Sequence, residues 1–199
     1  SIGINGTNDE VTVSNTLTLA NGILTTSPAN LLNITRSAAG AITGGSTTSF
    51  INGPVKWSTS LNTTYNFPVG KGSIYLPLSL KTNATSGTSA QVEAFNSDSG
   101  GTANFTTPTV ASTVGSLSNT EYWSLLTAGT FTNATISISR PNAISPLDLI
   151  AGSTSVNGTY TSLGGVPNTT GVDNSSAIGN NRFFTFGRKH EIHSKYINK

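Results

Sequence analysis

Hydrophobic and polar residues alternate with a period of two along several stretches of the chain. In residues 11–19, Val and Leu occupy positions 11, 13, 17 and 19, while Thr and Ser occupy the even positions. Because successive side chains of a β-strand point to opposite faces, this alternation predicts strands with one buried side. Further strands are predicted at 32–34, 74–80, 92–94, 123–125, 133–139 and 184–186. No window of helical length has an apolar period of 3.6 residues, so we expect an all-β protein.

Turn-forming residues divide the chain into two parts that differ in the spacing and composition of their predicted strands. Residues 1–57 contain short Thr- and Leu-rich passes separated by turns such as Asn21-Gly22 and Gly44-Gly45, a pattern typical of a β-solenoid. Residues 58–189 contain less regular strands with inserted aromatic residues, which favours an antiparallel β-sandwich. Pro77 interrupts one predicted strand and indicates an edge or a bulge there. The predicted fold is therefore a short β-solenoid (β-helix) packed on a β-sandwich, followed by a basic C-terminal tail at 190–199.

The composition narrows the classes of function. The 199 residues include 27 Ser, 32 Thr and 21 Asn, whereas only 9% are charged. Cys is absent, which excludes disulfides, thiolate metal sites and cysteine nucleophiles. The longest apolar runs have only a few residues, against roughly 18 for a membrane helix, so we expect no membrane insertion.

Positive charge is concentrated at the C-terminal end. Residues 182–199 carry five basic residues and one acidic residue, whereas residues 1–181 carry five basic and seven acidic ones. The body therefore has no basic stripe, and no nucleic-acid partner is expected. We predict instead that the tail docks on its own sandwich or on a neighbouring subunit. The candidate docking residues are Arg188, Lys189, His190, His193, Lys195 and Tyr196.

Motifs for chemistry are weak. The eight acidic residues include no pair whose spacing requires shared catalytic work, although facing carboxylates can come from any two strands. Glu121, beside Tyr122 and Trp123, is expected to pair with a Lys or Arg. His190 and His193 have a metal-ligand spacing but lack further ligands at fixed positions, and Gly70-Lys71-Gly72 fits a turn better than a phosphate loop. We predict no catalytic residue, metal or cofactor.

Large aromatic residues allow one alternative. Trp57, Tyr65, Trp123 and Tyr160 are candidates for a platform that stacks on sugar rings, as in carbohydrate-binding modules. Core aromatic residues are the more common interpretation, because such side chains dominate sandwich packing.

Six strings in this order carry a resemblance to a known family: LTLANGIL (17–24), FINGPV (50–55), YNFPVGKG (65–72), YLPLSL (75–80), EYWSLL (121–126) and RFFTFG (182–187). Together they resemble a surface module of large secreted, adhesin-like proteins of Bacteroidota. The resemblance implies a β-helical stalk that ends at the Asn-Gly-Pro turn and a sandwich closed by the last string. It also implies export by the type IX route, usually with a C-terminal sorting domain. Because only a short tail follows Gly187, we expect either that this domain was removed or that the chain is a piece of a longer protein.

The sequence thus predicts a non-enzymatic, extracellular structural or adhesive protein of the cell surface. Its expected partners are copies of itself, in a homo-oligomer or filament, or neighbouring modules of the same protein, and surface glycans are a further option. Unpaired solenoid coils at one end and a docking tail at the other favour head-to-tail assembly. A carbohydrate-binding module is the first alternative function, and a hydrolase fragment is the second.

Overall fold

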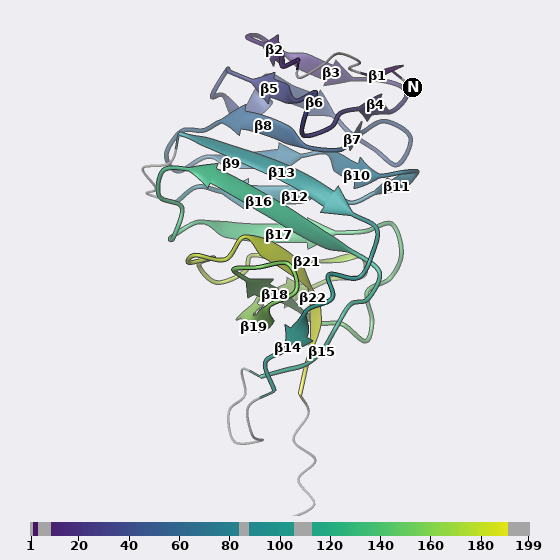
Figure 1. Ribbon diagram of the computed structural model, residues 1–199, viewed down its shortest axis with the longest axis vertical. Coiled ribbons are helices and arrows are strands. Elements are labelled where there is room, and N and C mark those ends of the chain that lie inside the picture. Colours follow the sequence, from purple (N-terminus) through teal and green to yellow (C-terminus); the bar gives the residue numbers. More distant parts are fainter. Residues whose placement is uncertain (1, 4–8, 84–87, 106–112, 191–199) are drawn as a thin grey trace, which may run out of the picture.

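The computed structural model describes residues 2–3, 9–83, 88–105 and 113–190 (Figure 1). Strands account for 49% of the structure and helix for 2%, arranged in several sheets, which confirms the all-β prediction. The one helical turn formed by the described residues, Ala39–Ala41, is far too short to cross a membrane.

The N-terminal strands form three ladders of parallel pairs at one end of the molecule (Figure 1). The first ladder contains β1 (Ile2–Gly3), β4 (Leu24–Thr25), β7 (Ile51–Asn52) and β10 (Val69–Lys71). The second contains β2 (Val11–Val13), β5 (Leu32–Ile34) and β8 (Val55–Ser58), and the third contains β3 (Leu17–Leu19) and β6 (Ile42–Gly44). The chain visits the ladders in the same order on its first two passes, so the second pass lies directly on the first.

Antiparallel pairing dominates the rest of the chain. One sheet has the order β20 (Val166–Pro167), β21 (Gly171–Asp173), β17 (Thr135–Ser139), β12 (Leu78–Lys81), β9 (Thr64–Phe67). A larger sheet has the order β14 (Thr102–Ala103), β19 (Thr159–Gly164), β18 (Leu149–Ser153), β22 (Phe183–Lys189), β16 (Tyr122–Ala128), β13 (Ser89–Phe95), β8, β5, β2. β15 (Val114–Leu117) pairs with β22, and β11 (Ile74–Tyr75) pairs with β10.

One hydrophobic cluster joins the parallel and antiparallel regions. It includes Leu32 and Ile34 from the parallel strands and Leu80, Trp123 and Phe186 from the antiparallel ones. A smaller cluster gathers around Tyr160 and Leu149. Strand β8 lies at the junction, because it pairs in parallel with β5 on one side and antiparallel with β13 on the other. The proposed boundary between residues 57 and 58 falls inside this strand, and the division into domains stays a prediction.

Two stretches of alternation that predict single strands are each divided in the structure. Residues 11–19 form β2 and β3, with a bend between them, and the two strands belong to different sheets. Residues 74–80 form β11 and β12, again in different sheets, with Pro77 at the break. Pro77 follows β11, which is an edge strand as its proline suggests, and precedes β12, which is an inner strand between β9 and β17. Pro77 directly precedes β12 and lies opposite Ser139, where its carbonyl oxygen accepts a hydrogen bond from Ser139 N at 3.2 Å. Because proline has no N–H, it donates no bond to Ser139 in return.

Candidate functional site

The four aromatic residues of the predicted glycan platform all lie in the core. Trp57, Tyr65, Trp123 and Tyr160 are each 0% exposed. Trp57 Nε1 donates a hydrogen bond to the Arg36 carbonyl oxygen at 3.0 Å, and Trp123 Nε1 donates to the Leu76 carbonyl oxygen at 2.8 Å. Since a sugar ring must reach an exposed aromatic face, these four residues form no platform, and that interpretation is corrected.

The buried aromatic rings pack edge to face. The Trp57 ring lies 5.0 Å from Tyr65 and 5.4 Å from Phe67 between centroids, and Trp123 lies 5.4 Å from Phe186. This arrangement is the favourable one for aromatic pairs, because the ring edge is positive and the face negative. The tyrosine hydroxyls are also satisfied by backbone carbonyls: Tyr65 donates to Ser37 O at 2.6 Å and Tyr160 donates to Val156 O at 2.9 Å. Burial raises the pKa of Tyr160 above its ordinary value near 10.

Glu121 is the charged residue that the sequence singled out, and it forms a buried ion pair with Arg140. Both carboxylate oxygens accept from Arg140 Nη1 at 3.1 Å, and they also accept from Ser118 Oγ at 2.6 Å and Thr120 Oγ1 at 2.7 Å. The side chains of Glu121 and Arg140 are 5% and 16% exposed. Arg140 also donates to the carbonyl oxygens of Asn142 and Ala143. A cavity of about 320 Å³ adjoins the pair. With its hydrogen bonds committed internally, the ion pair is a structural clamp.

The sequence around Gly70-Lys71-Gly72 forms a hairpin, as expected, in which β10 pairs with β11. Gly72 adopts a φ of +63° in the turn, and its amide donates to Asn52 Oδ1 at 3.0 Å. Lys71 Nζ lies 3.0 Å from Glu93 Oε1 and 5.3 Å from the centroid of the Phe95 ring. Phe95 in turn stacks on Tyr122 at 4.4 Å. These contacts link the hairpin to β13 and β16, which is a structural role.

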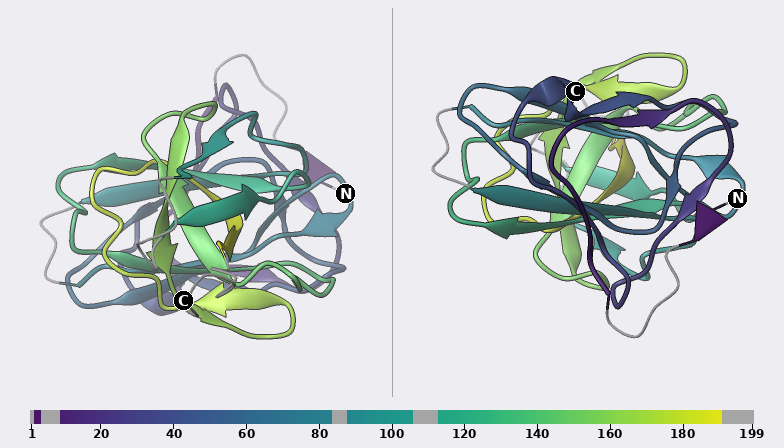
Figure 2. Two further views of the ribbon diagram at one scale, coloured as in Figure 1. Left: turned by 90° about the horizontal axis from the view of Figure 1, so that it is seen from below. Right: turned by 90° about the horizontal axis from the view of Figure 1, so that it is seen from above.

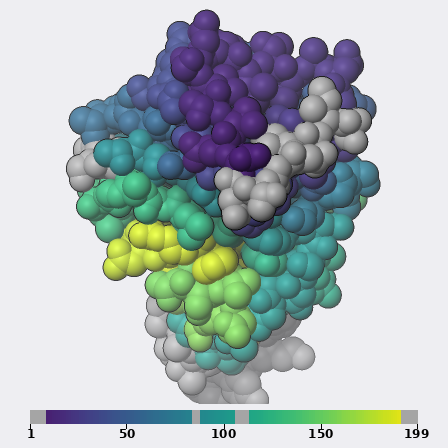
Figure 3. All heavy atoms as spheres, turned by 45° about the horizontal axis from the view of Figure 1, so that its top comes forward, coloured from purple at the N-terminus to yellow at the C-terminus, as the bar shows by residue number. Residues whose placement is uncertain are grey.

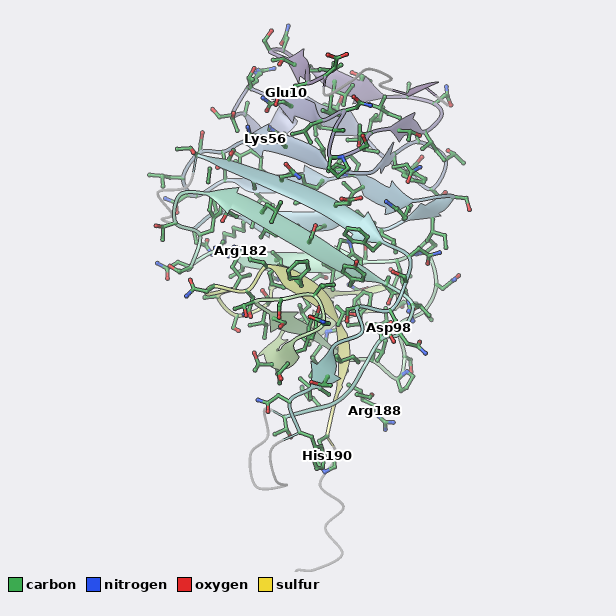
Figure 4. The ribbon with its side chains drawn as sticks, in the orientation of Figure 1. Glu10, Lys56, Asp98, Arg182, Arg188 and His190 are labelled. Atoms are coloured by element: carbon green, nitrogen blue, oxygen red, sulfur yellow. The ribbon has the colours of Figure 1, made fainter. Side chains whose placement is uncertain are left out.

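The beginning of the predicted docking segment is part of the body of the protein. Arg188 and Lys189 end β22, where they pair with β15, and the Lys189 amide donates to Asp148 Oδ1 at 2.8 Å. His190 packs edge-on against Phe105 at 4.6 Å, and its amide donates to Thr113 O. Figure 4 shows Arg188 and His190 at the end of the molecule opposite Glu10. His193, Lys195 and Tyr196 lie outside the described residues. In the described ranges no group of three or more His, Asp or Glu could hold a metal ion.

The first pass of the parallel region consists of β1, β2 and β3, and each of these strands lies at the end of a different sheet. β1 and β2 are the last strands of their sheets, and β3 pairs only with β6 among the described strands. All three lie at the same end of the molecule, where the purple N-terminal residues form the end face (Figure 3). Seen from above in Figure 2, the first pass covers the strands beneath it. Val11 is 41% exposed, and residues 17–24 line a shallow pocket of about 190 Å³.

A groove of about 350 Å³ crosses the outer face of the smaller antiparallel sheet. The register places Asn66, Ser79 and Ser137 side by side on β9, β12 and β17, and the pairing of β17 with β21 adds Asp173 to this row. Tyr75 lies in the wall of the groove, together with Pro68 and Pro77. Sequence reasoning missed this site. Alternation predicts which residues of each strand face outward, but it does not predict which strands are neighbours.

Comparisons of the chain with family models, with curated proteins and with solved structures find no match. The resemblance to the adhesin-like module therefore remains a prediction from the six strings.

Proposed function

We propose that this protein is a non-enzymatic structural or adhesive module of an extracellular, cell-surface protein, and that it associates end to end through its first pass of strands. The observation that carries the proposal is that β1, β2 and β3 each end a sheet at the same end of the molecule. Sheet edges carry unpaired N–H and C=O groups, which are templates for a further strand. Here three edges point in one direction.

The parallel passes are best explained as a short β-solenoid packed on a β-sandwich. Three observations support this interpretation: the ladders are parallel, the chain returns to the first ladder three times, and Leu32 and Ile34 of the second pass are fully buried. A repeat stack of this kind needs a cap at each end, because every repeat buries its faces against its neighbours. At the far end the antiparallel strands provide the cap. At the near end, a second copy or a neighbouring module of the same protein supplies it.

The opposite end of the molecule offers the second half of a head-to-tail contact. Arg188 and His190 lie there, far from Glu10 and the first pass (Figure 4). Contacts between two different surfaces of identical copies build a filament when the rotation between successive copies does not bring them back into a closed ring. Extracellular placement is supported by the resemblance to secreted adhesin-like modules and by the Ser-, Thr- and Asn-rich composition with only 9% charged residues.

Sedimentation velocity over a concentration series tests the association. Thr12 is the middle residue of β2, and its neighbours Val11 and Val13 direct their backbone bonds toward β5: Val11 N donates to Leu31 O and Val13 O accepts from Thr35 N. Because backbone groups alternate between the two sides of a strand, the Thr12 N–H points to the outer edge. Thr12→Pro removes this donor and places a ring at the edge, as natural edge strands do.

We expect the wild-type chain to form larger species as its concentration rises and Thr12→Pro to remain monomeric. Thr12→Val is the matched control, since it changes the same side chain but keeps the N–H, and it should associate like the wild type. Removing residues 191–199 leaves the described contacts of β22 intact and should weaken association if the tail contributes to the other half of the contact. A wild-type chain that stays monomeric throughout the series contradicts the proposal.

A further inference from the structure

We propose that the groove across β9, β12, β17 and β21 is a binding site for a neutral saccharide. It is separate from the end-to-end contact, because none of its strands belongs to the first pass. In Figure 1 β12 and β17 lie behind β13 and β16, so the outer face that carries the groove is turned away from the viewer. The volume of about 350 Å³ falls within the range of small-ligand clefts, roughly 300–1,000 Å³.

The groove presents a row of hydrogen-bonding side chains. Asn66, Ser79, Ser137 and Asp173 lie on four adjacent strands in register. Neighbouring strands are about 4.8 Å apart, so the row spans about 14 Å across the sheet. A ligand that follows the row therefore runs across the strands. It meets side chains alone, since the backbone groups of β12 and β17 already bond to strands on both sides.

Each of these four side chains keeps hydrogen-bonding capacity that the described part of the protein does not use. Among the described residues, none forms a side-chain hydrogen bond with Asn66 or Ser79. Ser137 Oγ accepts from the Asn174 amide at 3.0 Å, which leaves its hydroxyl proton available. Asp173 Oδ2 accepts from Asn168 Nδ2 at 2.8 Å, and its other carboxylate oxygen has no partner within the described part of the chain. The groove thus combines donors and acceptors over a short distance.

One wall of the groove is apolar. Tyr75 is partly buried, and its ring packs against Phe50 with centroids 5.9 Å apart. Pro68 and Pro77 also line the groove. A pyranose has both kinds of surface, because its hydroxyls bond in the ring plane while its C–H faces pack on aromatic and apolar groups. The groove offers hydrogen bonds along its floor and an apolar contact at its side.

The charge of the groove lining indicates which saccharides the groove can bind. The lining contains one acid, Asp173, and no cation. An anionic sugar would bring its carboxylate or sulfate toward Asp173 without a compensating positive charge, and like charges in contact are unfavourable. A neutral sugar instead donates its hydroxyls to Asp173, and a hydrogen bond to an ionised acceptor is about twice as strong as one between neutral groups. The inferred ligand is therefore a neutral oligosaccharide.

Isothermal titration calorimetry of the full chain tests the inference, with cellohexaose, xylohexaose, mannohexaose and laminarihexaose as neutral probes and trigalacturonate as the anionic probe. At least one neutral probe should bind, and trigalacturonate should not. Asp173→Asn should weaken binding by about tenfold or more, because a hydrogen bond to a charged group contributes that much to affinity. If no neutral hexasaccharide releases or absorbs heat at millimolar concentration, or if trigalacturonate binds equally well, the inference is wrong.

A pair of substitutions on one strand separates the groove from the rest of the face. Ser79 and Lys81 both point outward from β12, but only Ser79 lines the groove. Ser79→Tyr should fill the groove and abolish binding, whereas Lys81→Tyr should leave affinity unchanged, and circular dichroism checks that both variants are folded. Binding that survives in Ser79→Tyr overturns the site. Thr12→Pro should bind the sugar normally, so this result and the sedimentation result can fail independently.

Discussion

Removing the Glu121 carboxylate is expected to destabilise the fold strongly. Glu121→Ala takes away the acceptor for Arg140 Nη1, Ser118 Oγ and Thr120 Oγ1, and the Arg140 side chain is only 16% exposed in the wild-type structure. Breaking a buried pair by removing one partner costs about 3–5 kcal/mol, because the remaining charge is left uncompensated. For a chain of this size, each kcal/mol lowers Tm by about 2–4 °C, so the expected loss is about 6–20 °C.

Chemical denaturation at pH 7, followed by fluorescence of the buried Trp57 and Trp123, measures this loss. Glu93→Ala is a matched control, since Glu93 accepts from Lys71, whose side chain is 41% exposed, and the expected cost is about 1 kcal/mol or less. Arg140→Ala and the double variant complete a thermodynamic cycle, which should give a coupling energy of about 0.5–3 kcal/mol. Equal losses for Glu121→Ala and Glu93→Ala, or additive losses around the cycle, would refute the clamp.

Two further predictions concern burial. Burial raises the pKa values of Tyr75, Tyr122 and Tyr160 above their ordinary value near 10. The folded state therefore holds these protons more tightly than the unfolded state. Their contribution to stability is complete below pH 10 and is lost as the pH rises above it. A pH titration of phenolate absorbance should show late ionisation, together with a falling unfolding midpoint. Gly70→Ala should cost about 1–3 kcal/mol, because a Cβ there would clash with Ile74 O and with the Phe50 ring. Gly40→Ala, with nothing within 4 Å of the new Cβ, should be neutral or slightly stabilising in thermal unfolding.

The sequence predicts strands well where every second residue is buried along one straight strand. It predicts them poorly where the chain turns a corner without interrupting this alternation. Ile136 and Ile138 are buried on β17, as their alternation with Thr and Ser predicts. Leu17 continues the alternation that includes Val13, yet a bend between these two residues moves the chain from one sheet to another. The alternation shows only which side of a strand each residue faces. A corner that preserves the inward side leaves the pattern unchanged, so alternation alone does not reveal it.

The sequence predicts that Glu121 pairs with a Lys or Arg, but it does not predict which one. An acid between Ser, Thr and aromatic residues predicts a cation nearby, but Arg140 is 19 residues away on a loop that follows β17. The groove is harder still, because its four floor residues come from strands that are adjacent only after β9, β12, β17 and β21 have been ordered. Long-range register of this kind depends on packing of the whole core, and a single sequence gives no direct signal for it.

Both proposed surfaces follow from a composition that is rich in Ser, Thr and Asn and has only 9% charged residues. A protein of this composition has few cations or anions with which to recognise a partner. Two kinds of polar group remain: backbone N–H and C=O groups where a sheet ends, and short neutral side chains where a sheet face is concave. β2 and β3 supply the first kind, and the row from Asn66 to Ser137 supplies the second. Short side chains also keep the face open, because Ser79 and Ser137 leave space that longer residues would fill. The composition therefore favours recognition through short neutral side chains and backbone groups, with Asp173 as the one charged side chain in the lining of the groove.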